Sequence, residues 1–173
     1  NADLILGPEM KSTGEVMGID ASFGIAFAKS QMAAGFDLPL KGNVFISVHD
    51  QHKERMLPIA KTLRDMGFRI LATGRTAAHL RKNGVDCQPI KKVSEGRPHV
   101  VDYIKNGDIQ IVINTGVGRR SSLDGYHIRR GALTYNIPYT TTIAGARAVT
   151  EAITALQNAP WGVRPLQEYY KRQ

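Results

Sequence analysis

Between residue 42 and residue 158, short apolar runs alternate with longer segments of helical periodicity, and this alternation constrains the fold most. The apolar runs predict five strands, at residues 43–48, 68–73, 85–90, 109–114 and 138–140. The segments between and after them predict helices at residues 52–66, 76–83, 98–106, 122–136 and 143–158. Strands that alternate with helices pair in parallel and are covered on both faces. The sequence therefore predicts a three-layer α/β/α fold around a five-stranded parallel sheet.

The first part of the chain follows a different pattern. Residues 4–17 contain Gly, Pro, Ser and Thr without a sustained period. A helix is predicted next, capped by Asp20 and ended by Gly35, and a short connector follows it. We therefore expect two units, residues 1–40 and residues 41–173.

The net charge of +8, from 23 basic and 15 acidic residues, predicts attraction to anions such as nucleic acid, acidic membranes or phosphorylated small molecules. No apolar run is long enough to cross a membrane. Aromatic residues make up only 7% of the chain and the basic residues are spread over several loops, so no nucleic-acid stacking platform is expected. The single cysteine, Cys87, cannot form an internal disulfide, which favours a reducing compartment such as the cytoplasm. Since Asn1 is not a starting Met and no signal peptide follows it, we expect a piece of a longer protein.

The most informative polar residues follow the second predicted strand. In open parallel sheets, ligands bind beyond the carboxyl ends of the strands. The segment Thr73-Gly74-Arg75-Thr76 lies where such a strand turns into a helix. Backbone N–H groups at the start of that helix and the two hydroxyls could together hold an anion. The alternative is an ordinary helix N-cap.

Two further strand ends carry basic side chains. Lys53 is expected in the first turn of the helix after the first strand, where a cation opposes the helix dipole unless an anion is bound nearby. The loop at residues 91–99, which contains Lys92, is basic and could reach a phosphate from the side. A solvated lysine and ordinary loop charge are the respective alternatives.

The loop after the fourth strand offers Asn114 and Thr115 as hydrogen-bonding groups. It is rich in glycine, but Ser121 stands where a dinucleotide-binding fingerprint needs its third Gly, and no Gly-Lys-Ser/Thr of a P-loop is present. The five histidines lack metal-ligand spacing, and neither a Gly-x-Ser-x-Gly elbow nor a well-placed carboxylate pair occurs. We therefore predict neither a metal nor a catalytic residue.

Several motifs together resemble the C-terminal part of the large subunit of glutamine-dependent carbamoyl phosphate synthetase. The most specific is Gly7-Pro8-Glu9-Met10-Lys11-Ser12-Thr13-Gly14-Glu15-Val16-Met17-Gly18. The others lie at residues 53–55, 72–76, 92–99, 113–115, 118–120, 128–130 and 139–141.

This resemblance implies that residues 1–40 are the tail of the second ATP-grasp unit and a linker. Residues 41–173 would be the methylglyoxal-synthase-like allosteric domain, with strand order 3-2-1-4-5. The parent enzyme would make carbamoyl phosphate, for arginine and pyrimidine synthesis, from bicarbonate, glutamine-derived ammonia and two ATP. ATP and Mg or Mn would belong to the parent, and no cofactor to this piece. The ATP-grasp units and a glutaminase small subunit would be its partners.

By the same resemblance the domain binds a nucleoside monophosphate, UMP or IMP, as an effector, and is not itself catalytic. Matched positions for the phosphate and ribose are Lys53, Thr73, Thr76, Lys92, Asn114 and Thr115. Tyr139 and Thr141 match positions that bind ornithine in some bacterial members. The resemblance also implies a homo-oligomer, and the composition described above favours neither nucleic-acid nor membrane partners.

Two departures affect these expectations. Gly116 stands where relatives often carry a second Thr, which removes one donor worth about 0.5–1.5 kcal/mol. Gly118-Arg119-Arg120 stands where methylglyoxal synthase carries Gly-Gly-Asp with its catalytic carboxylate. Arg stays protonated and cannot act as a base at neutral pH. The alternative function is a methylglyoxal-synthase-like lyase acting on dihydroxyacetone phosphate.

Overall fold

A five-stranded parallel sheet forms the centre of the computed structural model, which describes residues 16–116, 119–158 and 161–170. The strands are β1 (Asn43–Val48), β2 (Arg69–Thr73), β3 (Gln88–Ile90), β4 (Ile111–Thr115) and β5 (Tyr139–Thr140). Their order is β3-β2-β1-β4-β5. The predicted fold class and strand order are confirmed.

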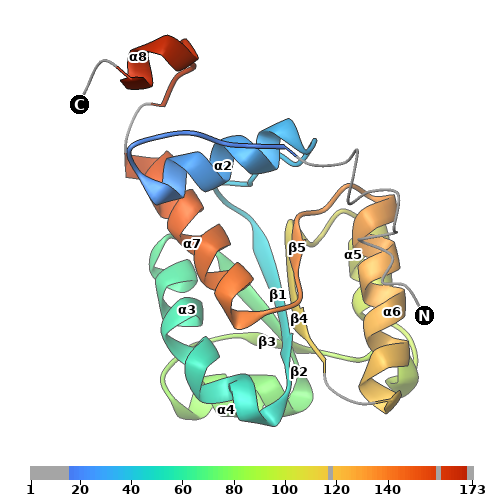
Figure 1. Ribbon diagram of the computed structural model, residues 1–173. Coiled ribbons are helices and arrows are strands. Elements are labelled where there is room, and N and C mark those ends of the chain that lie inside the picture. Colours follow the sequence, from blue (N-terminus) through green and yellow to red (C-terminus); the bar gives the residue numbers. More distant parts are fainter. Residues whose placement is uncertain (1–15, 117–118, 159–160, 171–173) are drawn as a thin grey trace.

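Helices cover both faces of the sheet (Figure 1). The helices of the described chain are α2 (Phe23–Ala33), α3 (Lys53–Asp65), α4 (Gly74–Lys82), α5 (Val100–Lys105), α6 (Arg119–Thr134), α7 (Ile143–Asn158) and α8 (Leu166–Tyr170), with single 3-10 turns η1 (Asp50–His52) and η2 (Val93–Glu95). α8 lies away from the sheet (Figure 1). α3, α4 and α7 lie on one face, and α5 and α6 on the other.

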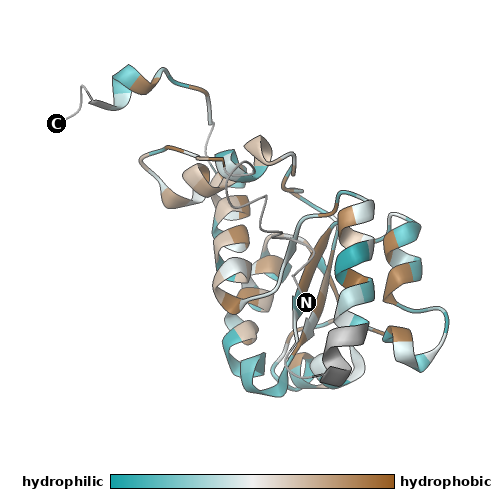
Figure 2. Cartoon of the chain, turned by 45° about the vertical axis from the view of Figure 1, so that its right-hand side comes forward, coloured by the Kyte–Doolittle hydropathy of each residue, from teal (hydrophilic) through white to brown (hydrophobic). Residues whose placement is uncertain are grey.

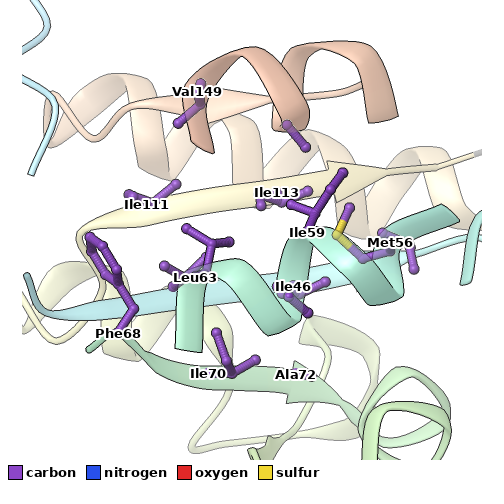
Figure 3. Close-up of a cluster of buried hydrophobic side chains, with 14 of the residues drawn as sticks. Ile46, Met56, Ile59, Leu63, Phe68, Ile70, Ala72, Ile111, Ile113 and Val149 are labelled. Carbon is purple, nitrogen blue, oxygen red and sulfur yellow. The ribbon is translucent and has the colours of Figure 1, made fainter. Parts of the chain in front are cut away.

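The three central strands β1, β2 and β4 contribute alternate side chains to two cores, because successive residues of a strand point to opposite faces. In β1, Val44 and Ile46 pack under α3, α4 and α7, whereas Phe45 packs under α5 and α6. Figure 3 shows the first of these cores, with Leu63 of α3 among the strand side chains. The central strands are thus apolar on both faces, and hydropathy colouring shows brown segments between the helical layers (Figure 2).

Some element boundaries differ from the predicted ones. The third strand contains only residues 88–90, because the buried residues before it pack without pairing to β2. Pro98 does not begin a helix: His99 is the N-cap of α5, and the Arg97–Pro98 peptide bond is cis. The helix predicted at 122–136 runs from Arg119 to Thr134.

Asp20 does not cap the helix predicted after it. α2 begins at Phe23, and the N-cap position is Ser22. The Asp20 carboxylate accepts a hydrogen bond from the Ser22 N–H and pairs with Lys29 Nζ at 2.7 Å. Asp20 cannot cap the helix because it lies two residues before the N-cap, and its carboxylate reaches the side of the helix instead.

α2 packs closely against α7. A Cβ on Gly24 would lie 2.8 Å from Ala155 Cβ and 2.8 Å from the Glu151 carbonyl oxygen, so only glycine allows this approach. Ala28 of α2 and Leu38 of the following connector are buried in the larger core. Most of the motif at residues 7–18 lies outside the described residues.

Candidate functional site

β1, β2 and β4 end at one cavity on the carboxyl edge of the sheet. It measures about 550 Å³ when the solvent at its open mouth is included. The lining residues come from these strand ends, the start of α4, the loop before η2, and α6: Ser47, Val48, His49, Thr73, Arg75, Thr76, Lys92, Asn114, Thr115, Gly116, Asp124, Gly125 and Ile128. Every predicted phosphate- or ribose-site residue except Lys53 belongs to this set.

Buried hydroxyls form the floor next to β2. Thr73 and Thr76 are each 2% exposed. Thr73 Oγ1 lies 3.2 Å from Ser47 Oγ and 3.4 Å from Thr76 Oγ1. The backbone N–H of Val48 donates to Thr76 Oγ1 at 3.4 Å. Because that N–H can only donate, Thr76 Oγ1 accepts there and its own proton remains available to a bound anion.

The start of α4 adds backbone donors beside these hydroxyls. Thr73 is the N-cap residue, yet its side chain makes no capping hydrogen bond, and no acidic residue lies in the first turn. A helix N-terminus leaves its first N–H groups without intrahelical partners and carries a partial positive charge. Thr73 therefore occupies the N-cap position of the alternative interpretation but leaves these N–H groups without its hydroxyl, and an anion would satisfy them.

Lys92 brings a cation to the cavity from the loop after β3. Its side chain is half-buried, and within the described ranges its ammonium has no hydrogen bond or ion pair. The loop is held against α6, because the Asp124 carboxylate accepts from the Ser94 N–H at 3.1 Å and from Ser94 Oγ at 2.9 Å. Lys92 thus projects from an anchored loop.

β4 contributes two buried polar residues with different surroundings. Asn114 is 5% exposed and lines the cavity. Thr115 Oγ1 lies 2.9 Å from His52 Nδ1 and accepts from the His49 N–H at 3.4 Å. The Thr115 hydroxyl is therefore engaged with the segment after β1.

A glycine of α6 permits the close approach to β4. A Cβ on Gly125 would lie 3.3 Å from Asn114 Oδ1 and 2.9 Å from a guanidinium nitrogen of Arg129. Arg129 thereby lies just behind the cavity wall. Any larger residue at position 125 would displace one of these polar groups.

Lys53 does not line the cavity. Its Nζ pairs with Asp50 Oδ1 at 2.8 Å, and the other oxygen of the same carboxylate accepts from Arg75 at 3.0 Å. The hydrogen bond from Lys53 is the main cause that lowers the pKa of Asp50 below its usual value. Arg75 thus lies at the rim, and one carboxylate joins it to Lys53 beside the rim.

The two residues matched to ornithine lie elsewhere. Tyr139 is half-buried in β5 and packs against the core under α5 and α6, and Thr141 follows β5 at the edge of the sheet. Neither residue lines the cavity described above. The structure therefore separates this pair from the phosphate-type site.

Several lining residues were not predicted as site residues. Ser47 could have been found locally, because a hydroxyl interrupts the apolar run of β1 near its carboxyl end. Asp124, Gly125 and Ile128 lie on α6, which the chain brings back over the cavity only through tertiary packing. No local pattern marks these three.

The described residues contain neither a cluster of metal ligands nor a helix suited to a membrane. No group of three or more His, Cys, Asp or Glu side chains there could hold a metal ion. None of the helices in this part of the chain combines the length and the apolar character needed to cross a bilayer.

Residues 55–141 match the family model described as the MGS-like domain. The chain belongs to the MGS-like domain family. The match spans β2 to β5 and includes the cavity-lining residues other than Ser47, Val48 and His49.

Proteins similar to this MGS-like chain share about half of its residues. It is 52% identical over 97% of its length to the carbamoyl phosphate synthase large chain of Mesorhizobium japonicum, and covers 14% of that protein. It is 49% identical over 98% of its length to the C-terminal section of this large chain in Methanopyrus kandleri, and covers 31% of it. These matches confirm the resemblance inferred from the motifs, and the chain spans only a minor part of each relative.

A solved structure supports the fold of this MGS-like domain. Methylglyoxal synthase from Elizabethkingia anophelis NUHP1 superposes with a TM-score of 0.54 over 79% of this chain and 94% of the synthase. The sequence identity is 18%, so this likeness concerns the fold alone.

Proposed function

We propose that this chain is an allosteric effector-binding domain and that its cavity binds the phosphate of a nucleoside monophosphate such as UMP or IMP. The observation that carries the proposal is the convergence of three features at one cavity: the Thr73 and Thr76 hydroxyls, the uncapped start of α4, and Lys92, whose ammonium has no partner among the described residues. Each of these groups favours a bound anion, and buried charge-assisted hydrogen bonds are the strong ones.

The other lining groups suit the rest of a nucleotide. Asn114 supplies an amide, and Ile128 adds an apolar side chain on the same cavity. Gly116 contributes no side-chain donor at the exposed end of β4. We therefore place the phosphate against α4 and Lys92, and the sugar and base toward β4 and α6.

A lyase reaction on dihydroxyacetone phosphate has less support. Asp124 is the carboxylate among the described lining residues, and both of its oxygens accept hydrogen bonds from Ser94. This arrangement fits a loop anchor better than a general base. We expect no methylglyoxal from dihydroxyacetone phosphate, and measurable turnover would favour the lyase.

The proposal extends to the longer protein. Similarity along 97% of the chain supports a place at the C-terminal end of a carbamoyl phosphate synthase large subunit. The partners would then be the ATP-grasp units and a glutaminase small subunit, in the cytoplasm. Tyr139 and Thr141, at the edge of the sheet, are proposed to contact ornithine.

Thermal unfolding with UMP and with IMP tests the effector proposal. A ligand that binds only the folded state at 100 times its Kd adds about 2.7 kcal/mol, or roughly 5–10 °C in Tm for a chain of this size. Lys92→Ala should remove the shift, because it removes the unpaired ammonium. Lys91→Ala is the matched control, since Lys91 is exposed and its ammonium donates only to the Arg97 carbonyl within the described residues. A flat response to both nucleotides at millimolar concentration, or a shift retained by Lys92→Ala, would contradict the proposal.

A further inference from the structure

One carboxylate at the rim of the cavity holds two cations from two different helices. Asp50 lies in η1, Lys53 in the first turn of α3 and Arg75 in the first turn of α4. Asp50 Oδ1 is 2.8 Å from Lys53 Nζ, and Asp50 Oδ2 is 3.0 Å from Arg75 Nη1. The Arg75 side chain belongs to the cavity lining, so the ion-paired group extends to its mouth.

Exposure shows which of these contacts can change. The Lys53 side chain is only 14% exposed, whereas those of Asp50 and Arg75 are 54% and 75% exposed. Exposed ion pairs add little to stability. The ion pair between Asp50 and Arg75 therefore stabilises the fold little. Its main effect is to lower the positive charge at the cavity mouth, where an anion enters.

The cation and the hydrogen-bond donors at the floor of the cavity match one phosphate group. Lys92, the start of α4 and the two Thr hydroxyls face the floor. A second phosphate would extend toward the mouth and would need further cations there. Arg75 lies at that place, and Asp50 links it to Lys53, but Asp50 cancels one of these two positive charges and occupies donors of both.

We propose that Asp50 is a specificity-determining residue that restricts this site to single phosphate groups and disfavours diphosphates. The inference rests on the proposed function, because it concerns the same cavity. Its physical basis is repulsion, since a second phosphate brings negative charge close to the Asp50 carboxylate and finds the rim cations already paired.

The test compares UMP with UDP, and IMP with IDP, by isothermal titration of the full chain and its variants. The original chain should bind the monophosphates more tightly. In Asp50→Asn the carboxylate charge is lost and Lys53 and Arg75 are released. The ratio of diphosphate to monophosphate affinity should then rise about fivefold or more, since one unit charge at contact distance has an effect of this order even in water.

Glu54→Gln is the matched control. Glu54 is the residue next to Lys53, is 80% exposed and faces His79 at 3.5 Å instead of the rim cations. The substitution removes one negative charge four residues along the chain from Asp50, in the first turn of α3, and should leave the ratio unchanged. An equal rise in Glu54→Gln, or an unchanged ratio in Asp50→Asn with monophosphate binding intact, would overturn the inference while the proposed function stands. If neither the original chain nor either variant binds any of the four nucleotides, the inference and the proposed function are both overturned.

Discussion

At the scale of single residues, the cavity combines groups that differ in how firmly they are held. The hydroxyls of Thr73 and Thr76 are buried and contact each other, whereas the Lys92 ammonium has no partner among the described residues. A buried donor without a ligand costs free energy, and hydroxyls limit that cost by bonding to one another. The Lys92 ammonium avoids this cost because Lys92 is only half-buried, so that water can reach its charge.

Asp102, near the basic loop, gives a pH-dependent prediction. Its carboxylate accepts from the His99 N–H at 2.9 Å and pairs with Arg97, and the Arg97 contact is the main cause that lowers its pKa to about 2. A carboxylate whose pKa is lowered by folding stabilises the folded state above its ordinary pKa of 3.8, and that contribution is lost as the pH falls through about 2. Asp102→Asn should therefore lower Tm at neutral pH.

The difference in Tm between the original chain and Asp102→Asn should shrink between about pH 4 and about pH 2. Thermal melts followed by circular dichroism across this range measure it. Asp108→Asn, at an exposed position near the other end of α5, serves as the comparison. A constant difference at all pH values would show that the loss comes from packing and not from the charge.

At the scale of elements, the crossing of α2 over α7 depends on a missing side chain. Gly24→Ala places a methyl group 2.8 Å from both Ala155 Cβ and the Glu151 carbonyl. Overpacking of this kind costs about 1–3 kcal/mol, against about 1 kcal/mol gained from better helix propensity. We expect a lower midpoint of urea unfolding, because α2 must move away from α7.

Gly162→Ala provides the control, since no atom lies within 4 Å of a Cβ at that position. Its unfolding midpoint should stay near that of the original chain. If Gly24→Ala proves as stable as Gly162→Ala, the close crossing of α2 and α7 does not contribute to stability.

At the scale of the whole molecule, the proposed boundary near residue 40 can be tested by removing residues 1–40. The cavity residues all lie after that point, so binding of UMP should persist. Ile25 and Leu38 are each 6% exposed, and full burial of such a side chain contributes about 1.5–3 kcal/mol. The shortened chain should therefore unfold at a lower urea concentration. An unchanged midpoint would mean that the first unit does not stabilise the second.

The elements of this fold could be predicted from the sequence where neighbouring residues alone determine them. The run at residues 43–48 predicted β1 with its observed bounds, because it is apolar and flanked by Gly42 and His49. The predicted range of the third strand, residues 85–90, was too long, because Val85 and Cys87 are buried without pairing to β2. The order of the strands came from the resemblance and not from the periodicity.

The same distinction applies to the cavity. Thr73, Thr76 and Lys92 were found because each follows a predicted strand. The pairing of Lys53 and Arg75 through Asp50 could not be foreseen, because it joins side chains of two helices. The contact of Ser94 with Asp124 spans 30 residues and depends equally on tertiary packing.

The mutual hydrogen bonding of Ser47, Thr73 and Thr76 has a kinetic consequence. When a ligand binds, these hydroxyls need only rotate about their C–O bonds, and no backbone segment has to change conformation. The association rate is then set by diffusion into the cavity, and differences in affinity among ligands come mainly from their dissociation rates.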